Sequence, residues 1–180
     1  MVATTWQLGL FLAHHRPDLA INVGIAGALD VQLTIGDVVH VTTERFGDLG
    51  VEEADGRLTD LFELGLLEAD TPPYHHAILI NSAGADTQFL PTVHGLTVNK
   101  VHGSAASIAA LRAKYPDAQV ETMEGAAFFY ACQLVGLPFL EIRSISNYVE
   151  PRNREAWDLA LAIGNLNTVL QHLLDTFFDR

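Results

Sequence analysis

The sequence predicts an α/β protein, a three-layer α/β/α sandwich around a mixed, largely parallel central sheet. Three observations favour this class. Short apolar segments alternate with segments of helical length along the whole chain. Glycine, proline and polar residues separate the two kinds of segment, as they do at the ends of strands and helices. The last expected strand, 139–145, is interpreted as an apolar strand of the type buried on both faces in parallel sheets.

Segments with the length and composition of helices are 3–15, 61–68, 104–115, 126–135 and roughly 154–178. Proline or glycine, which cannot continue a helix without cost, follows the first four, at Pro17, Pro72, Pro116 and Gly136. The last segment carries one apolar stripe, formed by Leu159, Ile163, Leu166, Leu170 and Leu173.

Segments typical of strands are 19–25, 38–43, 77–81, 95–101, 118–122 and 139–145. Residues 24–28 are interpreted as a glycine-bounded turn at a strand end, either a place where backbone N–H groups approach a ligand or a plain tight turn. The acidic stretch 44–60 is expected to be a solvated loop, and 82–91 an irregular segment.

Length and charge limit the function. With 180 residues, 49% of them hydrophobic, and no linker-like stretch, we expect one domain over 1–180. The net charge of −12, with only ten Lys and Arg, argues against binding to nucleic acid or to an anionic membrane surface. A single cysteine, Cys132, allows no disulfide framework, so we expect a reducing, cytoplasmic environment.

The beginning of the chain lacks a basic leader, and no apolar run approaches the roughly 20 residues of a membrane span. The chain also opens on a helix, whereas α/β domains more often open on a strand. We therefore expect the first strand of the fold to be missing.

Polar residues follow the last two expected strands. Glu124 comes at the entrance of an apolar helix, and Asn147 ends the strand at 139–145. In open α/β sheets, ligands bind outside the carboxyl ends of the strands. Glu124 is either an acid that interacts with the helix dipole or a carboxylate that accepts hydrogen bonds from sugar hydroxyls. Asn147 is either a ligand for a base or a cap of the strand end.

The motifs NVGIAGAL, IGDVV, VETMEGAA and IRSISN, in this order and spacing, resemble the superfamily of nucleoside phosphorylases and nucleosidases, which includes methylthioadenosine/S-adenosylhomocysteine nucleosidase. The resemblance covers nearly the whole chain. Within the superfamily, ETMEGAAFFYAC and ISNYVEPRNREAW are most similar to the futalosine hydrolases. That resemblance implies hydrolysis of futalosine to hypoxanthine and dehypoxanthine futalosine, a step of menaquinone biosynthesis.

The resemblance also implies roles for residues. Glu124 would hold the ribose hydroxyls and stabilise the positive charge on the sugar, and Met123 would lie against the ribose face. Asn147 would face the purine, where its amide can donate to a 6-oxo oxygen and accept from N1–H, which favours hypoxanthine. Ala26 and Gly27 would contribute the backbone of the glycine segment.

Further residues around the base and the lid follow from the same resemblance. Val101 and His102 match the loop that packs on the base. Trp157 matches an aromatic lid, although it is also compatible with ordinary helix packing. Arg152 and Arg154 are candidates for the benzoate of futalosine or simply solvated side chains.

Hydrolysis is favoured over phosphorolysis. Phosphorylases of the superfamily place Arg and Ser around the glycine segment, and Asn22 and Ile25 stand at the matching positions here. Arg143 could still bind an anion, or it could pair with an acid of the fold. The histidines show no metal-ligand spacing, and we expect neither a metal nor another cofactor.

One difference from the family concerns the start of the chain. The family begins with a strand and a glutamate that activates water, and no residue here matches that glutamate. We expect weak or no activity from the 180-residue chain unless the natural product is longer. Rival interpretations are another purine nucleosidase, a phosphorylase, or a non-catalytic nucleoside-binding protein. The resemblance also implies a homo-oligomer, a dimer or larger.

Overall fold

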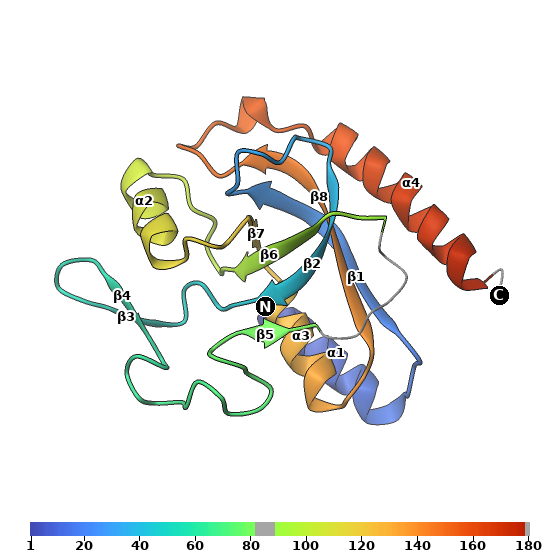
Figure 1. Ribbon diagram of the computed structural model, residues 1–180, viewed down its shortest axis with the longest axis horizontal. Helices are drawn as coiled ribbons and strands as arrows, with labels where there is room; N and C mark the ends of the chain where they lie inside the picture. The colour runs from blue at the N-terminus through green and yellow to red at the C-terminus, as the bar shows by residue number, and fades with distance from the viewer. Residues whose placement is uncertain (82–88, 179–180) are drawn as a thin grey trace.

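The computed structural model describes residues 1–81 and 89–178 (Figure 1). Its helices are α1 (Val2–His14), α2 (Ala105–Lys114), α3 (Gly125–Leu134), α4 (Leu159–Phe178) and a short 3-10 helix, Arg154–Ala156. Its strands are β1 (Ala20–Ala28), β2 (Val38–Glu44), β3 (Gly50–Glu52), β4 (Leu58–Asp60), β5 (Leu79–Ile80), β6 (Thr92–Thr97), β7 (Val120–Thr122) and β8 (Phe139–Tyr148).

The main sheet has the strand order β5-β2-β6-β7-β1-β8 and closes on itself, because β2 also pairs with β8. The pairs β1–β8, β2–β6 and β6–β7 are parallel, whereas β1–β7, β2–β8 and β2–β5 are antiparallel. The predicted mixed sheet is thus confirmed, and its barrel-like closure was not foreseen. Register shifts in β1 and β2 accompany the closure, since bulges increase strand twist.

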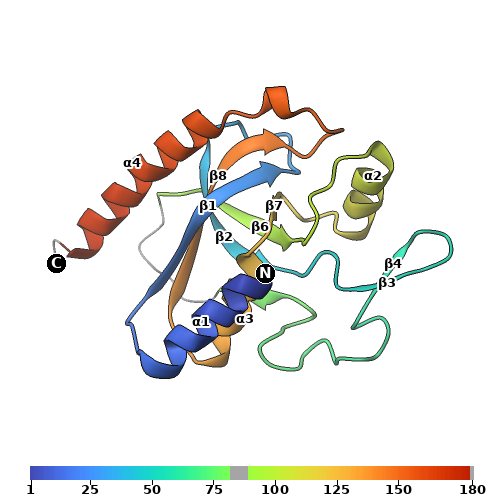
Figure 2. The same cartoon turned by 180° about the vertical axis from the view of Figure 1, so that it is seen from behind.

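Helices cover the sheet on two sides (Figures 1 and 2). Helix α3 buries Phe128, Phe129 and Cys132 in one core cluster, where the Phe129 ring lies 4.6 Å from that of Phe139. Helix α4 packs on the other side, with Leu166 and Leu173 in a second cluster. The predicted α/β class is confirmed by these two helical layers.

The two faces of strand β8 pack in different core clusters and differ in their side chains. Leu140 and Ile142 belong to the core cluster under α4, whereas Phe139 and Ile145 belong to the cluster under α3. Because side chains alternate along a strand, Glu141 and Arg143 share the face of Phe139 and Ile145. The expected buried, parallel strand at 139–145 is therefore confirmed, since β8 pairs in parallel with β1 and is buried from Phe139 to Ser146, but one of its faces contains buried charge that was not foreseen.

Several element predictions need correction. The expected turn at 24–28 remains in strand β1, which continues to Ala28 through a register shift. The strand expected at 95–101 lies earlier, at Thr92–Thr97, and the acidic loop 44–60 contains the β3–β4 hairpin. The last helix is interrupted at Trp157 and Asp158, between the 3-10 helix and α4.

No helix forms over 61–68, where the structure has turns. The Asp60 carboxylate accepts from the backbone N–H groups of Phe62 and Glu63, which favours a turn over a helix. Gly65 then adopts φ +67°, outside the helical region. Of the segment expected to be irregular, residues 82–88 lie outside the described part of the chain.

Candidate functional site

Strand pairing brings three chain-distant residues into one row. Gly27 of β1 pairs with Glu121 of β7 on one side and with Asn147 of β8 on the other. A small cavity of about 40 Å³ lies at this end of the sheet. Residues that the sequence marked as site candidates line much of it: Gly27, Val101, His102, Asn147, Arg152 and Trp157.

Gly27 leaves room for Asn147. A Cβ atom at position 27 would lie 2.9 Å from Val149 Cγ2 and 3.2 Å from Asn147 Nδ2. The Asn147 amide is oriented by its neighbours, because Oδ1 accepts from the Ser146 hydroxyl at 2.8 Å and Nδ2 donates to the Tyr148 carbonyl at 2.9 Å. One N–H and one lone pair of the amide remain available to a ligand.

A histidine and a buried acid form a close pair in the same cavity. His102 Nδ1 lies 2.5 Å from Glu121 Oε1, and the His102 backbone N–H lies 3.3 and 3.4 Å from the two carboxylate oxygens. Glu121 is only 5% exposed. His102 was a predicted site residue, but Glu121 was not, although an acid in the middle of a short buried strand was a visible signal.

A second group of charges lies near the middle of β1 and β8, further from the strand ends that form the cavity. Gly24 pairs with Arg143, whose guanidinium occupies the space where a side chain at position 24 would lie. Arg143 Nε donates to Glu141 Oε1 at 2.6 Å, and its Nη2 lies 3.7 Å from Glu124 Oε2. The Arg143 side chain is 3% exposed and that of Glu124 is 45% exposed. An accessible carboxylate therefore stands beside a buried cation.

Buried acids adjoin this group of charges. Glu44, fully buried, accepts from the hydroxyls of Thr97 at 2.8 Å and Thr122 at 3.2 Å. Burial and then the nearby Glu141 raise the pKa of Glu44 well above its ordinary value. Burial also raises the pKa of Glu141. Both changes favour the neutral carboxyl, because burial removes the water that stabilises a charged carboxylate.

Neither buried acid was predicted as part of the site. Glu44 was expected in a solvated loop, and Glu141 in an apolar strand. The alternation Phe139-Leu140-Glu141-Ile142-Arg143 was a usable signal, because it puts both charges on one face. Nothing local marks Glu44, which becomes buried through contacts with residues more than fifty positions away.

Of the other predicted site residues, Trp157 and Arg152 line the cavity, whereas Ala26, Met123, Glu124 and Arg143 do not. Trp157 receives the Arg152 guanidinium over its ring, at 4.9 Å from the centroid. Arg154 lies exposed in the 3-10 helix and does not line the cavity. Ala26 is 3% exposed, and its carbonyl accepts from the Ser146 hydroxyl. Met123 is 39% exposed, and its carbonyl accepts from the Met1 amino group.

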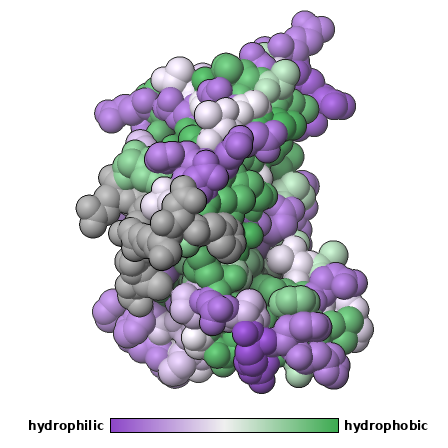
Figure 3. Space-filling view, turned by 90° about the vertical axis from the view of Figure 1, so that its right-hand side faces the viewer, coloured by the Kyte–Doolittle hydropathy of each residue, from purple (hydrophilic) through white to green (hydrophobic). Residues whose placement is uncertain are grey.

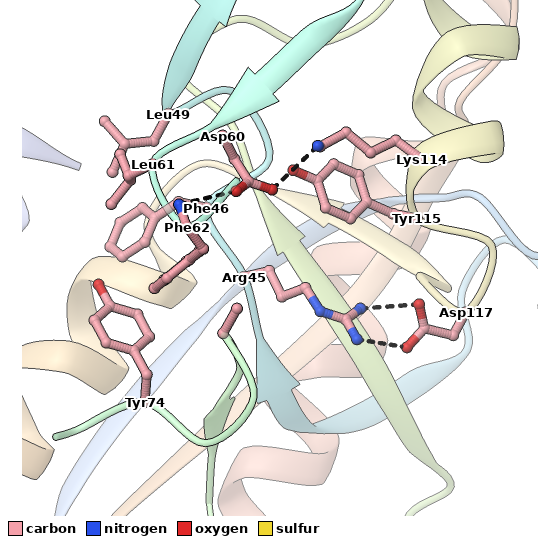
Figure 4. A pocket seen from close by; sticks show the side chains of 11 residues that line it. Arg45, Phe46, Leu49, Asp60, Leu61, Phe62, Tyr74, Lys114, Tyr115 and Asp117 are labelled. Atoms are coloured by element: carbon pink, nitrogen blue, oxygen red, sulfur yellow. Dashed lines mark hydrogen bonds and ion pairs between the residues drawn. The ribbon is translucent and has the colours of Figure 1, made fainter. Parts of the chain in front are cut away.

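A larger cavity, about 190 Å³, lies between the end of β2, the β3–β4 hairpin and α2 (Figure 4). Its cations are already paired: Arg45 makes two 2.9 Å hydrogen bonds with Asp117, and Lys114 contacts Asp60 at 3.1 Å. The Arg45 guanidinium lowers the pKa of Asp117. None of the candidates from the sequence lines this cavity.

Within residues 1–81 and 89–178, no three His, Cys, Asp or Glu side chains are grouped as a metal site requires. In the same described part of the chain, no helix has the length and apolarity needed to cross a membrane.

Comparison with known proteins agrees with this architecture. Residues 1–178 match the phosphorylase superfamily, and the chain belongs to that family. The futalosine hydrolase of Streptomyces coelicolor is 37% identical over 161 residues, which cover 88% of this chain and 66% of the relative. The futalosine hydrolase of Acidothermus cellulolyticus is 35% identical, covering 86% of this chain and 64% of the relative. The chain thus spans about two thirds of the length of these relatives.

Solved structures show the same fold. The methylthioadenosine/S-adenosylhomocysteine nucleosidase of Neisseria meningitidis, in complex with methylthio-immucillin-A, has a TM-score of 0.76 at 20% identity, covering 97% of this chain and 77% of that one. The futalosine hydrolase of Helicobacter pylori has a TM-score of 0.75 at 19% identity, covering 97% and 75%. The family resemblance inferred from the motifs is confirmed.

Proposed function

We propose that this chain hydrolyses the N-glycosidic bond of futalosine and releases hypoxanthine. The observation that carries the proposal is the half-exposed Glu124 carboxylate beside the buried guanidinium of Arg143. Arg143 lies on β8, and the end of this strand presents Asn147 to the cavity. The identity of 37% and 35% with two futalosine hydrolases supports this substrate.

Glu124 acts on the sugar in this proposal. Cleavage of an N-glycosidic bond builds positive charge on the ribose, and a nearby carboxylate stabilises that charge more than it stabilises the ground state. Arg143, itself held by Glu141, fixes the position of Glu124. Met123, whose side chain precedes Glu124 and is partly exposed, covers the ribose face.

Asn147 binds the base in this proposal. Its free N–H and lone pair match the 6-oxo oxygen and the N1–H of hypoxanthine. Trp157 closes the site, and Arg152, stacked on that ring, and the exposed Arg154 are the candidates for the benzoate. Because a cavity of about 40 Å³ is smaller than a nucleoside, the cavity has to widen when substrate enters.

Water is the proposed nucleophile, and the reaction needs no cofactor. Asn22 and Ile25 supply no cation beside the glycine segment. The guanidinium of Arg143, which lies against Gly24 of that segment, is already paired with Glu141 and Glu124. A phosphate dianion would therefore find this guanidinium already paired and would meet the carboxylate of Glu124 beside it.

We also propose that the chain self-associates in the cytoplasm, in a dimer or a larger assembly. Helix α1 turns an apolar stripe to solvent: Val2, Trp6 and Leu10 are 82%, 63% and 44% exposed. The face that carries β1, β8 and α4 also presents apolar surface (Figure 3). Such surfaces commonly mark interfaces. The buried thiol of Cys132, whose pKa burial raises to about 12, is compatible with a reducing compartment.

The experiment is a product assay. Purified protein is incubated with futalosine in phosphate-free buffer, and hypoxanthine is followed by chromatography, with inosine and methylthioadenosine as competing substrates. The assay uses the 180-residue chain. Release of hypoxanthine from futalosine supports the proposal. Cleavage of methylthioadenosine alone, or binding of futalosine without cleavage, would reject it.

A further inference from the structure

We infer that His102, held by Glu121, is the general acid that protonates the leaving purine at N7. This inference deepens the proposed function and rests on it. It assigns a proton-transfer role to the pair and adds Glu121 to the site as a positioning residue.

The chemistry requires a proton donor near the base. When the bond between N9 and C1′ breaks, both electrons remain on the purine, and protonation at N7 converts a poor anionic leaving group into a neutral one. Asn147 can donate a hydrogen bond, but its amide has no proton that it can transfer at ordinary pH. A different residue of the cavity must therefore supply the proton.

His102 has the required placement. It lines the same cavity as Asn147 and Trp157, and its side chain is 14% exposed, so bulk water has limited access to the ring. Glu121 binds Nδ1 at 2.5 Å, which leaves Nε2 on the other side of the ring. Among the described residues, no hydrogen-bond partner of Nε2 is found.

Glu121 has the environment of an orienting carboxylate. Its side chain is 3% exposed, and its strand position is set by pairing with Gly27 and Leu96. A carboxylate bound to one ring nitrogen sets the tautomer and orientation of histidine and stabilises its protonated form. The other charged groups that line the cavity with this pair are Glu150 and Arg152.

The proposed step is balanced. The Nε2 proton of protonated His102 moves to N7 while the bond between C1′ and N9 breaks with its electron pair on the base. A water oxygen then bonds to C1′, and the proton that this water releases restores protonated His102 through solvent. The net change is the addition of one water across the glycosidic bond.

The test compares leaving groups. His102→Gln and Glu121→Gln are assayed with futalosine and with 4-nitrophenyl β-ribofuranoside, whose nitrophenolate leaves without a proton. His102→Gln should lower kcat on futalosine by about 10²–10⁴-fold and change kcat on the nitrophenyl substrate by less than about threefold. Glu121→Gln should lower kcat on futalosine by a smaller factor, with KM little changed. His14→Gln, at an exposed histidine of α1, is the matched control.

A second readout is the pH profile of kcat on futalosine. In the wild type the rate should fall at alkaline pH as the acid loses its proton, and His102→Gln should lose that alkaline limb. Equal slowing of both substrates, or an unchanged alkaline limb, would show that the pair only holds the loop and would overturn the inference. Absence of hypoxanthine release by the wild type would instead reject the proposed function, and the inference with it.

Discussion

Burial decides which acidic residues of this protein belong to the core and which can contact a ligand. Glu44 has no exposed surface and lies near Glu141 around Gly125, so its carboxyl is stabilised in the neutral form. Glu124 is also an acid near Arg143, yet it remains 45% exposed and is free to meet a ligand. The same residue type therefore serves the core in one place and the proposed chemistry in another.

Replacing Glu44 by Gln should change how stability depends on pH. The pKa of Glu44 is raised in the folded protein, so the unfolded chain releases this proton first, and stability falls as pH rises above about 4.5 towards the folded value. Glu44→Gln should remove this pH-dependent loss of stability, which amounts to up to about 1.4 kcal/mol per pH unit in that window. Urea unfolding at several pH values measures the free energy of unfolding and its slope with pH. The exposed Glu68→Gln should leave the slope unchanged.

Replacing Glu124 by Gln should abolish most of the proposed activity. The amide keeps the hydrogen-bonding shape but loses the charge that stabilises the ribosyl cation, so kcat on futalosine should fall by at least about 100-fold. Stability should change little, because the side chain is half-exposed. Glu68→Gln is the control here as well, and an activity loss of less than tenfold for Glu124→Gln would remove this residue from the mechanism.

At the scale of elements, the start of helix α3 is built into the polar cluster of the sheet. The Ala126 N–H donates to the Thr97 hydroxyl at 2.7 Å, and the Gly125 N–H donates to that of Thr122 at 3.4 Å. These hydroxyls satisfy backbone groups that the first turn of a helix leaves free. Because both threonines also bind Glu44, the buried acid and the helix that follows Glu124 are held by one network.

Two helical glycines should respond in opposite ways to alanine. A Cβ at position 125 would overlap the Glu44 carboxylate and lie 2.8 Å from Glu141 Oε1, so Gly125→Ala should destabilise the protein by about 1–3 kcal/mol. Gly164 of α4 has no atom within 4 Å of that position, so Gly164→Ala should stabilise by about 0.5–1 kcal/mol. Thermal unfolding compares them. Equal effects of the two substitutions would contradict the close contact at Gly125.

At the scale of the whole molecule, apolar surface is left on the outside of α1. The stripe Val2, Trp6 and Leu10 recurs every four residues and faces solvent, while Leu12 of the same helix is buried. Leu134 and Val135, at the end of α3, are also more than half exposed, at 57% and 52%. A groove of about 320 Å³ between the two helices adds to this surface.

Self-association should therefore depend on α1. Wild-type protein should sediment as a dimer or larger, and Trp6→Glu should shift it towards the 19.6 kDa monomer, because a charge on the apolar stripe cannot be buried cheaply. Val31→Glu, at a residue 76% exposed outside the helix, is the matched control. A wild-type monomer, or an equal effect of both substitutions, would reject this surface as the interface.

The residues of the candidate site that belong to sequence motifs could be predicted from the sequence. Glu124 and Asn147 were predicted from their places at strand ends, and His102 and Trp157 from the family resemblance. Asn147, His102 and Trp157 meet at one cavity. Glu121, Glu141 and Glu44 were missed, because a buried acid looks like a solvated one until its neighbours are known. Their partners are His102, Arg143 and the threonines Thr97 and Thr122.

The sequence by itself determined the class of fold, most of its helices and strands, and the family, because periodicity and motif spacing are local properties of the chain. Tertiary structure alone decided that the sheet closes, that Gly27 lies between Glu121 and Asn147, and that Glu44 meets Glu141 around Gly125. These outcomes depend on strand register and partner choice between distant segments. A shift of one residue would turn every side chain of a strand to the other face.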